Sequence, residues 1–89
     1  MNDNLKFILG ERKIIQFEVI STKNEPVIIT DAAWVLTYHK QEVDKGSCTI
    51  DGNVMEILLE PNQEGTFELT ITYTIAPEIR KVRCMVNVY

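Results

Sequence analysis

The segment Gly65–Ile75 alternates apolar and polar residues without interruption. Its apolar positions are Phe67, Leu69, Ile71, Tyr73 and Ile75, and its polar positions are Thr66, Glu68, Thr70, Thr72 and Thr74. A period of two places successive side chains on opposite faces of an extended chain, and threonine and aromatic residues fit a pleated surface. The segment therefore predicts a long strand with one buried face and one solvent-facing face.

Six further segments have the composition of strands, and no segment has a sustained helical period. The predicted strands are Leu5–Leu9, Lys13–Ser21, Ala33–Lys40, Ser47–Ile50, Val54–Leu59, Thr66–Ile75 and Arg80–Tyr89. The predicted turns are Gly10-Glu11, Lys23–Pro26, Val43–Gly46, Asp51–Asn53, Pro61–Glu64 and Ala76–Ile79. Seven short strands in 89 residues predict one all-β domain, residues 1–89, with a seven-stranded antiparallel β-sandwich of the immunoglobulin-like or fibronectin-III-like kind.

The last two predicted strands can be aligned across the turn Ala76–Ile79. We predict that Ile75 pairs with Arg80 and that Pro77 takes the second turn position, where its fixed φ is favoured. In this register the opposed inward residues are Tyr73 with Val82, Ile71 with Cys84, Leu69 with Val86 and Phe67 with Val88. Both apolar rows then face the same side, as a half-buried hairpin requires.

The predicted core collects the inward residues of every strand. Besides the inward residues of the final hairpin, its members are Phe7, Ile15, Phe17, Val19, Trp34, Leu36, Tyr38, Cys48, Ile50, Met55, Ile57 and Leu59. Trp34 falls on the third strand, where immunoglobulin-like sandwiches place a central aromatic residue. We interpret it as a core indole, and a tryptophan that stacks on a ligand is the alternative.

The charge and the termini restrict the partners. The net charge is −4, and the nine Lys and Arg residues are scattered except at Arg80-Lys81-Arg83, which we interpret as a solvated strand face. We therefore expect no nucleic-acid partner. The apolar runs are too short to cross a membrane. Because Met1–Asn4 has neither the basic nor the apolar region of a secretory signal, we expect synthesis in a cytoplasm.

Few residues could support catalysis. His39 is the only histidine, and we predict it on the polar face of the third strand. Ser21 and Ser47 have no nucleophile context, and the acidic residues are spread over loops and outer faces rather than paired in a cleft. We therefore predict that the protein is not an enzyme and has no catalytic residues.

Metal and cofactor sites are not predicted either. Cys48 and Cys84 have only one histidine to complete a zinc site. Asp44, Asp51 and Asn53 could offer oxygens to calcium, but their spacing matches no calcium loop and they are typical turn residues.

A disulfide between Cys48 and Cys84 is conceivable, because both side chains should point inward. Antibody domains, however, place the tryptophan between the two cysteines, whereas Trp34 precedes both here. With no export signal, we predict two reduced, buried thiols.

Outward residues of the last two strands form a candidate partner surface. Alternation places these residues on one side: Thr70, Thr72, Arg83, Met85 and Tyr89. Ile14 and Ile20 should also face outward on the second strand, and exposed apolar surface often marks a contact with another protein. Ordinary solvent-facing strand residues are the alternative interpretation.

Two motifs of the chain occur together in one family. Asn24–Ala33 resembles the connection G-x-P-x-x-[IL]-T-x-A, with Asn24 in place of Gly. Pro61–Leu69 resembles P-x-x-x-G-x-[YF]-x-[LV], in which Gly65 permits a tight corner and the aromatic Phe67 fills the end of the sandwich. With these motifs the chain resembles small immunoglobulin-like modules in bacteriophage virion proteins, including the N-terminal modules of baseplate upper proteins from phages of Gram-positive bacteria.

The resemblance extends over roughly residues 13–75 and implies a virion structural or decoration protein of a phage or prophage. Such a protein is made in the bacterial cytoplasm, is incorporated into a virion, and contacts other virion components or copies of itself. The alternative is a carbohydrate- or peptide-binding module built on the loops Ser21–Asp31 and Ala76–Arg80.

Overall fold

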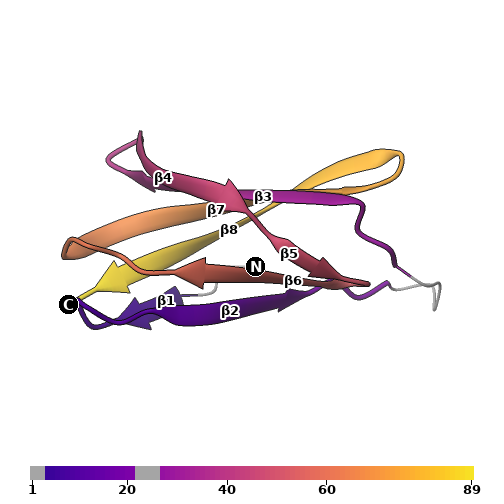
Figure 1. The fold of residues 1–89 in the computed structure, drawn as a ribbon. Coiled ribbons are helices and arrows are strands. Elements are labelled where there is room, and N and C mark those ends of the chain that lie inside the picture. Colours follow the sequence, from indigo (N-terminus) through magenta and orange to yellow (C-terminus); the bar gives the residue numbers. More distant parts are fainter. Residues whose placement is uncertain (1–3, 22–26) are drawn as a thin grey trace.

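Two packed sheets make up the computed structural model, which describes residues 4–21 and 27–89 (Figure 1). The strands are β1 (Asn4–Phe7), β2 (Lys13–Glu18), β3 (Asp31–Tyr38), β4 (Gln41–Ser47), β5 (Thr49–Asp51), β6 (Val54–Leu59), β7 (Gly65–Ile75) and β8 (Glu78–Val88). The described residues contain no helix. The predicted turn Lys23–Pro26 and the motif position Asn24 lie outside the described residues.

The sheet order is that of an immunoglobulin-like sandwich. One sheet has five strands in the order β1-β8-β7-β3-β4, and the other has three in the order β2-β6-β5. These sets correspond to the C, F and G strands on one side and the B, E and D strands on the other. The predicted fold class is therefore confirmed, although the described chain has eight strands, and β1 pairs with β8 in parallel rather than antiparallel.

The additional strand is β4, where the sequence predicted the turn Val43–Gly46. Its residues are almost all exposed, so it has no apolar row that a binary pattern could reveal. Val43 is the extra residue of a bulge, because Leu36 faces Asp44 and Thr37 faces Glu42. The predicted strand Ser47–Ile50 is also wrong, since the chain leaves one sheet at Ser47 and enters the other at β5.

His39 and Lys40 form a two-residue turn between β3 and β4, not the end of a strand as predicted. Both have positive φ, 50° and 65°, a combination that defines the type I′ hairpin turn and is usually occupied by Asn-Gly. Side chains with a β-carbon are disfavoured there by about 1–2 kcal/mol per residue. His39 and Lys40 are therefore not the residue types that best fit the backbone conformation of this turn.

Replacing His39-Lys40 with Asn-Gly is expected to stabilise the domain. Asn and Gly adopt positive φ with less backbone strain than His and Lys. This gain exceeds the cost of the extra unfolded-state entropy of glycine, so we expect the free energy of unfolding to rise by about 1 kcal/mol, measured by urea denaturation. The control is Lys40→Ala, which keeps the β-carbon and should bring no gain. An Asn-Gly variant no more stable than the original chain would contradict this account of the turn.

The β7–β8 hairpin pairs two residues away from the predicted register. The observed pairs are Ile75 with Glu78, Tyr73 with Arg80, Ile71 with Val82, Leu69 with Cys84 and Phe67 with Val86. The loop is only Ala76-Pro77, with a cis peptide bond between them, so Pro77 takes the third turn position rather than the second. A slip of two residues leaves every side chain on its predicted face, which is why the burial pattern alone could not decide the register.

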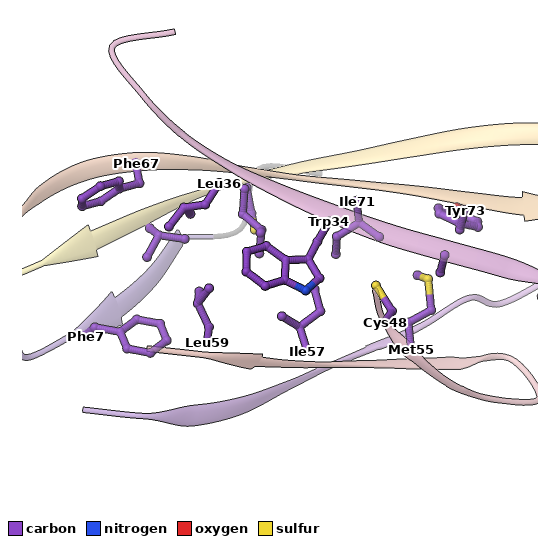
Figure 2. Packing of buried hydrophobic residues seen from close by; sticks show 14 of the residues in the cluster. Phe7, Trp34, Leu36, Cys48, Met55, Ile57, Leu59, Phe67, Ile71 and Tyr73 are labelled. Carbon is purple, nitrogen blue, oxygen red and sulfur yellow. The ribbon is translucent and has the colours of Figure 1, made fainter. Parts of the chain in front are cut away.

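Side chains from both sheets meet in one core (Figure 2). The most deeply buried are Phe7, Met55, Ile57, Leu59, Leu69, Ile71 and Val86. Several predicted core residues are only partly buried, namely Ile15, Phe17, Val19, Tyr38, Ile50, Ile75 and Val82. Ile15 and Phe17 lie on β2, at the edge of its sheet, where no described strand covers one side. Ile29 and Ala32 are buried although the sequence analysis did not include them.

Trp34 lies near the middle of this core, which confirms the interpretation of a buried indole (Figure 2). Its ring packs against the backbone of Gly46 on the neighbouring strand β4. A β-carbon at Gly46 would lie 2.9 Å from Nε1 and 3.0 Å from two ring carbons of Trp34. Glycine at position 46 therefore makes room for the indole, a pairing that local patterns do not reveal.

Candidate protein-contact surface

The outer face of the five-stranded sheet brings most of the predicted surface residues together. Two rows of outward residues cross the sheet from β4 to β8. One row is Lys45, Val35, Thr70 and Arg83, and the other is Ser47, Ala33, Thr72 and Lys81. Their centre consists of short uncharged side chains, and cationic side chains lie at three of the four ends, with Ser47 at the fourth. We call the set Ala33, Val35, Thr70, Thr72, Arg83 and Met85 the outer-face patch.

Met85 extends the patch next to Glu68, which it faces across the β7–β8 ladder. Its side chain is 38% exposed, and with Glu68, Arg83 and Cys84 it lines a shallow hollow of about 170 Å³. A partly exposed methionine beside an arginine is a combination enriched at protein interfaces. The hollow could accept one side chain of a partner.

Tyr89 lies apart from the other four predicted residues. It follows the end of β8, four residues after Met85, which is about 13 Å along an extended chain. Its backbone N–H donates to the Phe7 carbonyl at 2.9 Å and its carbonyl accepts from the Leu9 N–H at 2.8 Å, so its backbone continues the pairing with the β1 segment. Its ring is 63% exposed, at the far corner of the sheet.

Ile14 and Ile20 face outward as predicted, but Ile14 lies on β2 in the other sheet and Ile20 comes shortly after that strand. Ile14 is 63% exposed and lies directly opposite Leu58, which is 57% exposed. The exposed apolar residues are therefore divided between the two outer faces. Leu58 was not named among the outward apolar residues, although the predicted inward residues Ile57 and Leu59 already place it on the outer face.

His39 lies in the turn after β3, and the prediction that it lies on a strand face is wrong. Its ring contacts Tyr38 edge-on, with 4.1 Å between the ring centroids. Tyr38 in turn packs against Phe67, with 4.9 Å between centroids. The imidazole is therefore an exterior extension of the aromatic cluster at this end of the sandwich.

Cys48 and Cys84 are both buried and no disulfide joins them, as predicted. Burial raises the pKa of the Cys48 thiol, and the carboxylate of Asp31 raises it further. A thiol with a raised pKa stays protonated at neutral pH and is a poor nucleophile. Cys48 therefore serves as a small apolar core residue.

The three oxygen-bearing residues considered for calcium do not converge. Asp44 lies on β4 and accepts a hydrogen bond from the Lys45 N–H at 2.9 Å, whereas Asp51 ends β5 and Asn53 lies in the turn between β5 and β6 in the other sheet. The Asn53 amide donates to the Val19 carbonyl at 3.0 Å. Within residues 4–21 and 27–89, no three His, Cys, Asp or Glu side chains form a group that could hold a metal.

A second hollow, of about 200 Å³, lies between β4 and the β6–β7 loop. Its lining residues are Leu36, Val43, Asp44, Glu60, Pro61, Asn62, Gln63 and Phe67. The alternative ligand-binding hypothesis uses the loops Ser21–Asp31 and Ala76–Arg80, and residues 22–26 of the first lie outside the described residues. The described end of that loop meets β7 elsewhere, where the Thr30 N–H donates to the Thr74 carbonyl at 3.0 Å, near the β7–β8 turn. This contact and the hollow lie at opposite ends of the sandwich (Figure 1).

Comparison with known proteins identifies the fold. Neither a protein-family model nor a curated protein matches the sequence. An engineered protein of solved structure has a TM-score of 0.79 at 16% identity, over 98% of this chain and 18% of that one. A protein from Bacteroides vulgatus ATCC 8482, provisionally described as a glycoside hydrolase, has a TM-score of 0.60 at 20% identity, over 96% and 16% of the two chains.

The third structure is the complex of titin M10 with the obscurin-like 1 immunoglobulin domain, with a TM-score of 0.55 at 17% identity, over 97% of this chain and 85% of that one. This chain spans less than a fifth of the first two structures. At such identities the likeness establishes the fold alone. The protein has an immunoglobulin-like β-sandwich, and residues 4–21 and 27–89 contain no helix long and apolar enough to cross a membrane.

Proposed function

We propose that this chain is a non-enzymatic structural module that binds another protein through the outer-face patch, as a structural or decoration component of a phage or prophage virion. The observation that carries the contact surface is the composition of the two rows across β4, β3, β7 and β8. The resemblance of Pro61–Leu69 to phage modules supplies the virion part of the proposal.

The patch is physically suited to docking because its central side chains are short. Thr70, Thr72, Ala33 and Val35 lose little conformational entropy when a partner covers them, unlike the Lys and Glu side chains common on solvent-facing sheets. They also carry no charge that must be dehydrated. A pre-ordered face with short side chains can be buried at low cost.

The cations at the ends of the rows indicate the chemistry of the partner. Arg83 and Lys81 lie on β8, and Lys45 lies on β4 at the opposite edge. Charges at the rim of an interface select the partner and accelerate association more than they add affinity. The partner surface should therefore have an uncharged centre, with acidic groups opposite these cations.

The motif residues Gly65 and Phe67 occupy the positions that the resemblance implies. Gly65 has φ of 135° at the start of β7, and Phe67 is buried where β7 enters the sandwich. This agreement supports the resemblance, because a corner glycine followed by an end-filling aromatic is the physical content of the motif.

The substitution Met85→Glu tests this surface. It places a carboxylate in the patch without touching the core, and we expect incorporation of the chain into particles to fall at least about tenfold, since an unpaired charge at an interface costs 2 kcal/mol or more. Incorporation is measured by immunoblotting of particles purified from the bacterium that encodes the chain. Ile28→Glu is the matched control, because Ile28 is equally apolar and 65% exposed but lies outside the patch.

Equal incorporation of the Met85→Glu and Ile28→Glu chains would exclude the outer-face patch as the contact surface. A charge at Tyr89 separates the two parts of the predicted surface, because Tyr89 lies at the corner of the sheet. If only the Tyr89 substitution reduces incorporation, the contact involves the β1–β8 end instead.

A further inference from the structure

We infer that β2 pairs with β2 of a second copy of this chain, antiparallel and centred on Ile15, and joins the two three-stranded sheets into one sheet of six strands. This inference goes beyond the proposed function because it uses the opposite sheet. It rests on the backbone at the edge of β2, on the protection of the other edges, and on the charges that flank the strand.

The edge of β2 carries a row of backbone groups that point away from its sheet. β2 is the last strand in the order β2-β6-β5, and no described strand covers its other side. The Val19 N–H donates to the Asn53 carbonyl at 2.9 Å, so the odd-numbered residues direct their backbone groups toward β6. Antiparallel alternation then directs the N–H and C=O groups of Ile14, Gln16 and Glu18 to the open side.

The other three edges of the sandwich carry features that discourage pairing. β5 has only three residues, and β4 has a bulge and a run of charged side chains. On β1, the Lys13 ammonium donates to the Lys6 carbonyl at 3.0 Å and occupies that edge. β2 pairs with β6 without a bulge, contains no Gly or Pro, and has its two charged residues, Lys13 and Glu18, only at its ends.

The edge of β2 is complementary to itself in one register. Pairing about Ile15 places Ile14 opposite Gln16 of the second copy and Arg12 opposite Glu18 of the second copy, and the two-fold axis makes each contact twice. These even-numbered residues have outward backbone groups, so they form the hydrogen-bonded pairs of the new ladder. Shifting the centre to Gln16 would oppose Arg12 with Ile20 and lose both charge pairs.

The same register covers the exposed apolar residues of this face. Ile14 lies opposite Leu58 within one copy, and both are more than half exposed. In the pair of copies the two Ile14 side chains become diagonal neighbours across the new ladder, within reach of each other. Each copy has one exposed apolar pair, Ile14 with Leu58. In the dimer the two pairs form one row across both copies, in the order Leu58, Ile14, Ile14 and Leu58.

Light scattering across a range of protein concentrations tests the inference. The chain of 10.2 kDa should approach twice that mass as the concentration rises. Glu18→Arg should raise the dissociation constant at least about tenfold, because it opposes like charges at both ends of the ladder. The double variant Arg12→Glu/Glu18→Arg restores opposite charges and should recover the dimer. Far-UV circular dichroism with thermal unfolding confirms that each variant is folded.

A monomer at every concentration would overturn the inference, and so would a dimer that Glu18→Arg leaves unchanged. A double variant that remains monomeric while folded would exclude this register. Met85→Glu should leave the dimer intact, since Met85 lies on the other sheet. Failure of the β2 contact and failure of the outer-face patch are therefore distinguishable.

Discussion

Replacing Trp34 with alanine is expected to lower the free energy of unfolding by about 3–5 kcal/mol, which is a large part of the about 5–15 kcal/mol typical of a small domain. The indole lies between the two sheets and against Gly46, so its removal leaves a cavity that neither sheet can close (Figure 2). Urea unfolding followed by far-UV circular dichroism measures the effect, because the variant has no tryptophan fluorescence.

The matched control is Trp34→Phe, which keeps an aromatic ring at the site and leaves a smaller cavity. We expect it to cost clearly less than Trp34→Ala, because the penalty rises with the volume of the cavity. If the alanine variant lost no more stability than the phenylalanine variant, Trp34 would not be the centre of the core.

Gly65→Ala is the second substitution with a large expected effect, a loss of about 2–4 kcal/mol. The residue has φ of 135°, which side chains with a β-carbon rarely adopt. The added β-carbon would also lie 2.9 Å from Cε1 of Tyr38, whose ring packs on Phe67. Backbone strain and displacement of the aromatic cluster therefore add, and chemical denaturation measures their sum.

A Tyr38→Ala background separates these two causes. In that background the cost of Gly65→Ala should fall, because the contact with Cε1 is gone, while the strain at φ of 135° remains. Gly52→Ala is a reference without a contact, because Gly52 has φ of 62° and an added β-carbon there would have no heavy atom within 4 Å, so we expect a loss of only about 1 kcal/mol. An unchanged cost of Gly65→Ala in the Tyr38→Ala background would show that the contact with Tyr38 has no energetic consequence.

The sequence predicted the strands that have a strict alternation. β7 was predicted with its faces correctly assigned, because one-residue slips would bury threonine and expose five apolar side chains. The register of the β7–β8 hairpin was wrong because a two-residue slip preserves that pattern. Only the length of the turn distinguishes the two registers, and Ala76-Pro77-Glu78-Ile79 is compatible with both a four-residue and a two-residue loop.

Features that depend on contacts between distant residues were not predictable. β4 is polar and exposed, and it is a strand only because β3 offers an open edge for it to pair with. The reason for glycine at position 46 lies in Trp34, twelve residues earlier in the chain. The predicted inward residues Ile57 and Leu59 place Leu58 on the outer face, but its position opposite Ile14 depends on the pairing of β2 with β6.

The candidate surface was predicted only in part, because some of its residues come together through pairing between distant segments. Thr70, Thr72, Arg83 and Met85 share a side of one local hairpin, and alternation placed them together. Ala33 and Val35 complete the patch through the pairing of β3 with β7, which joins segments far apart in the sequence. Local pattern therefore identified the residues on the hairpin, and the uncharged centre of the face became visible only with the sheet order.

The most direct test of the central claim is the number of copies of this chain in purified particles. Particles from an induced bacterial strain that encodes it can be separated by density gradient and quantified by mass spectrometry against an isotope-labelled standard. The account predicts a fixed number of copies per particle that follows the particle peak and falls with Met85→Glu. A chain that remains in the soluble fraction, with a varying trace in the particle peak, would contradict the proposed virion role.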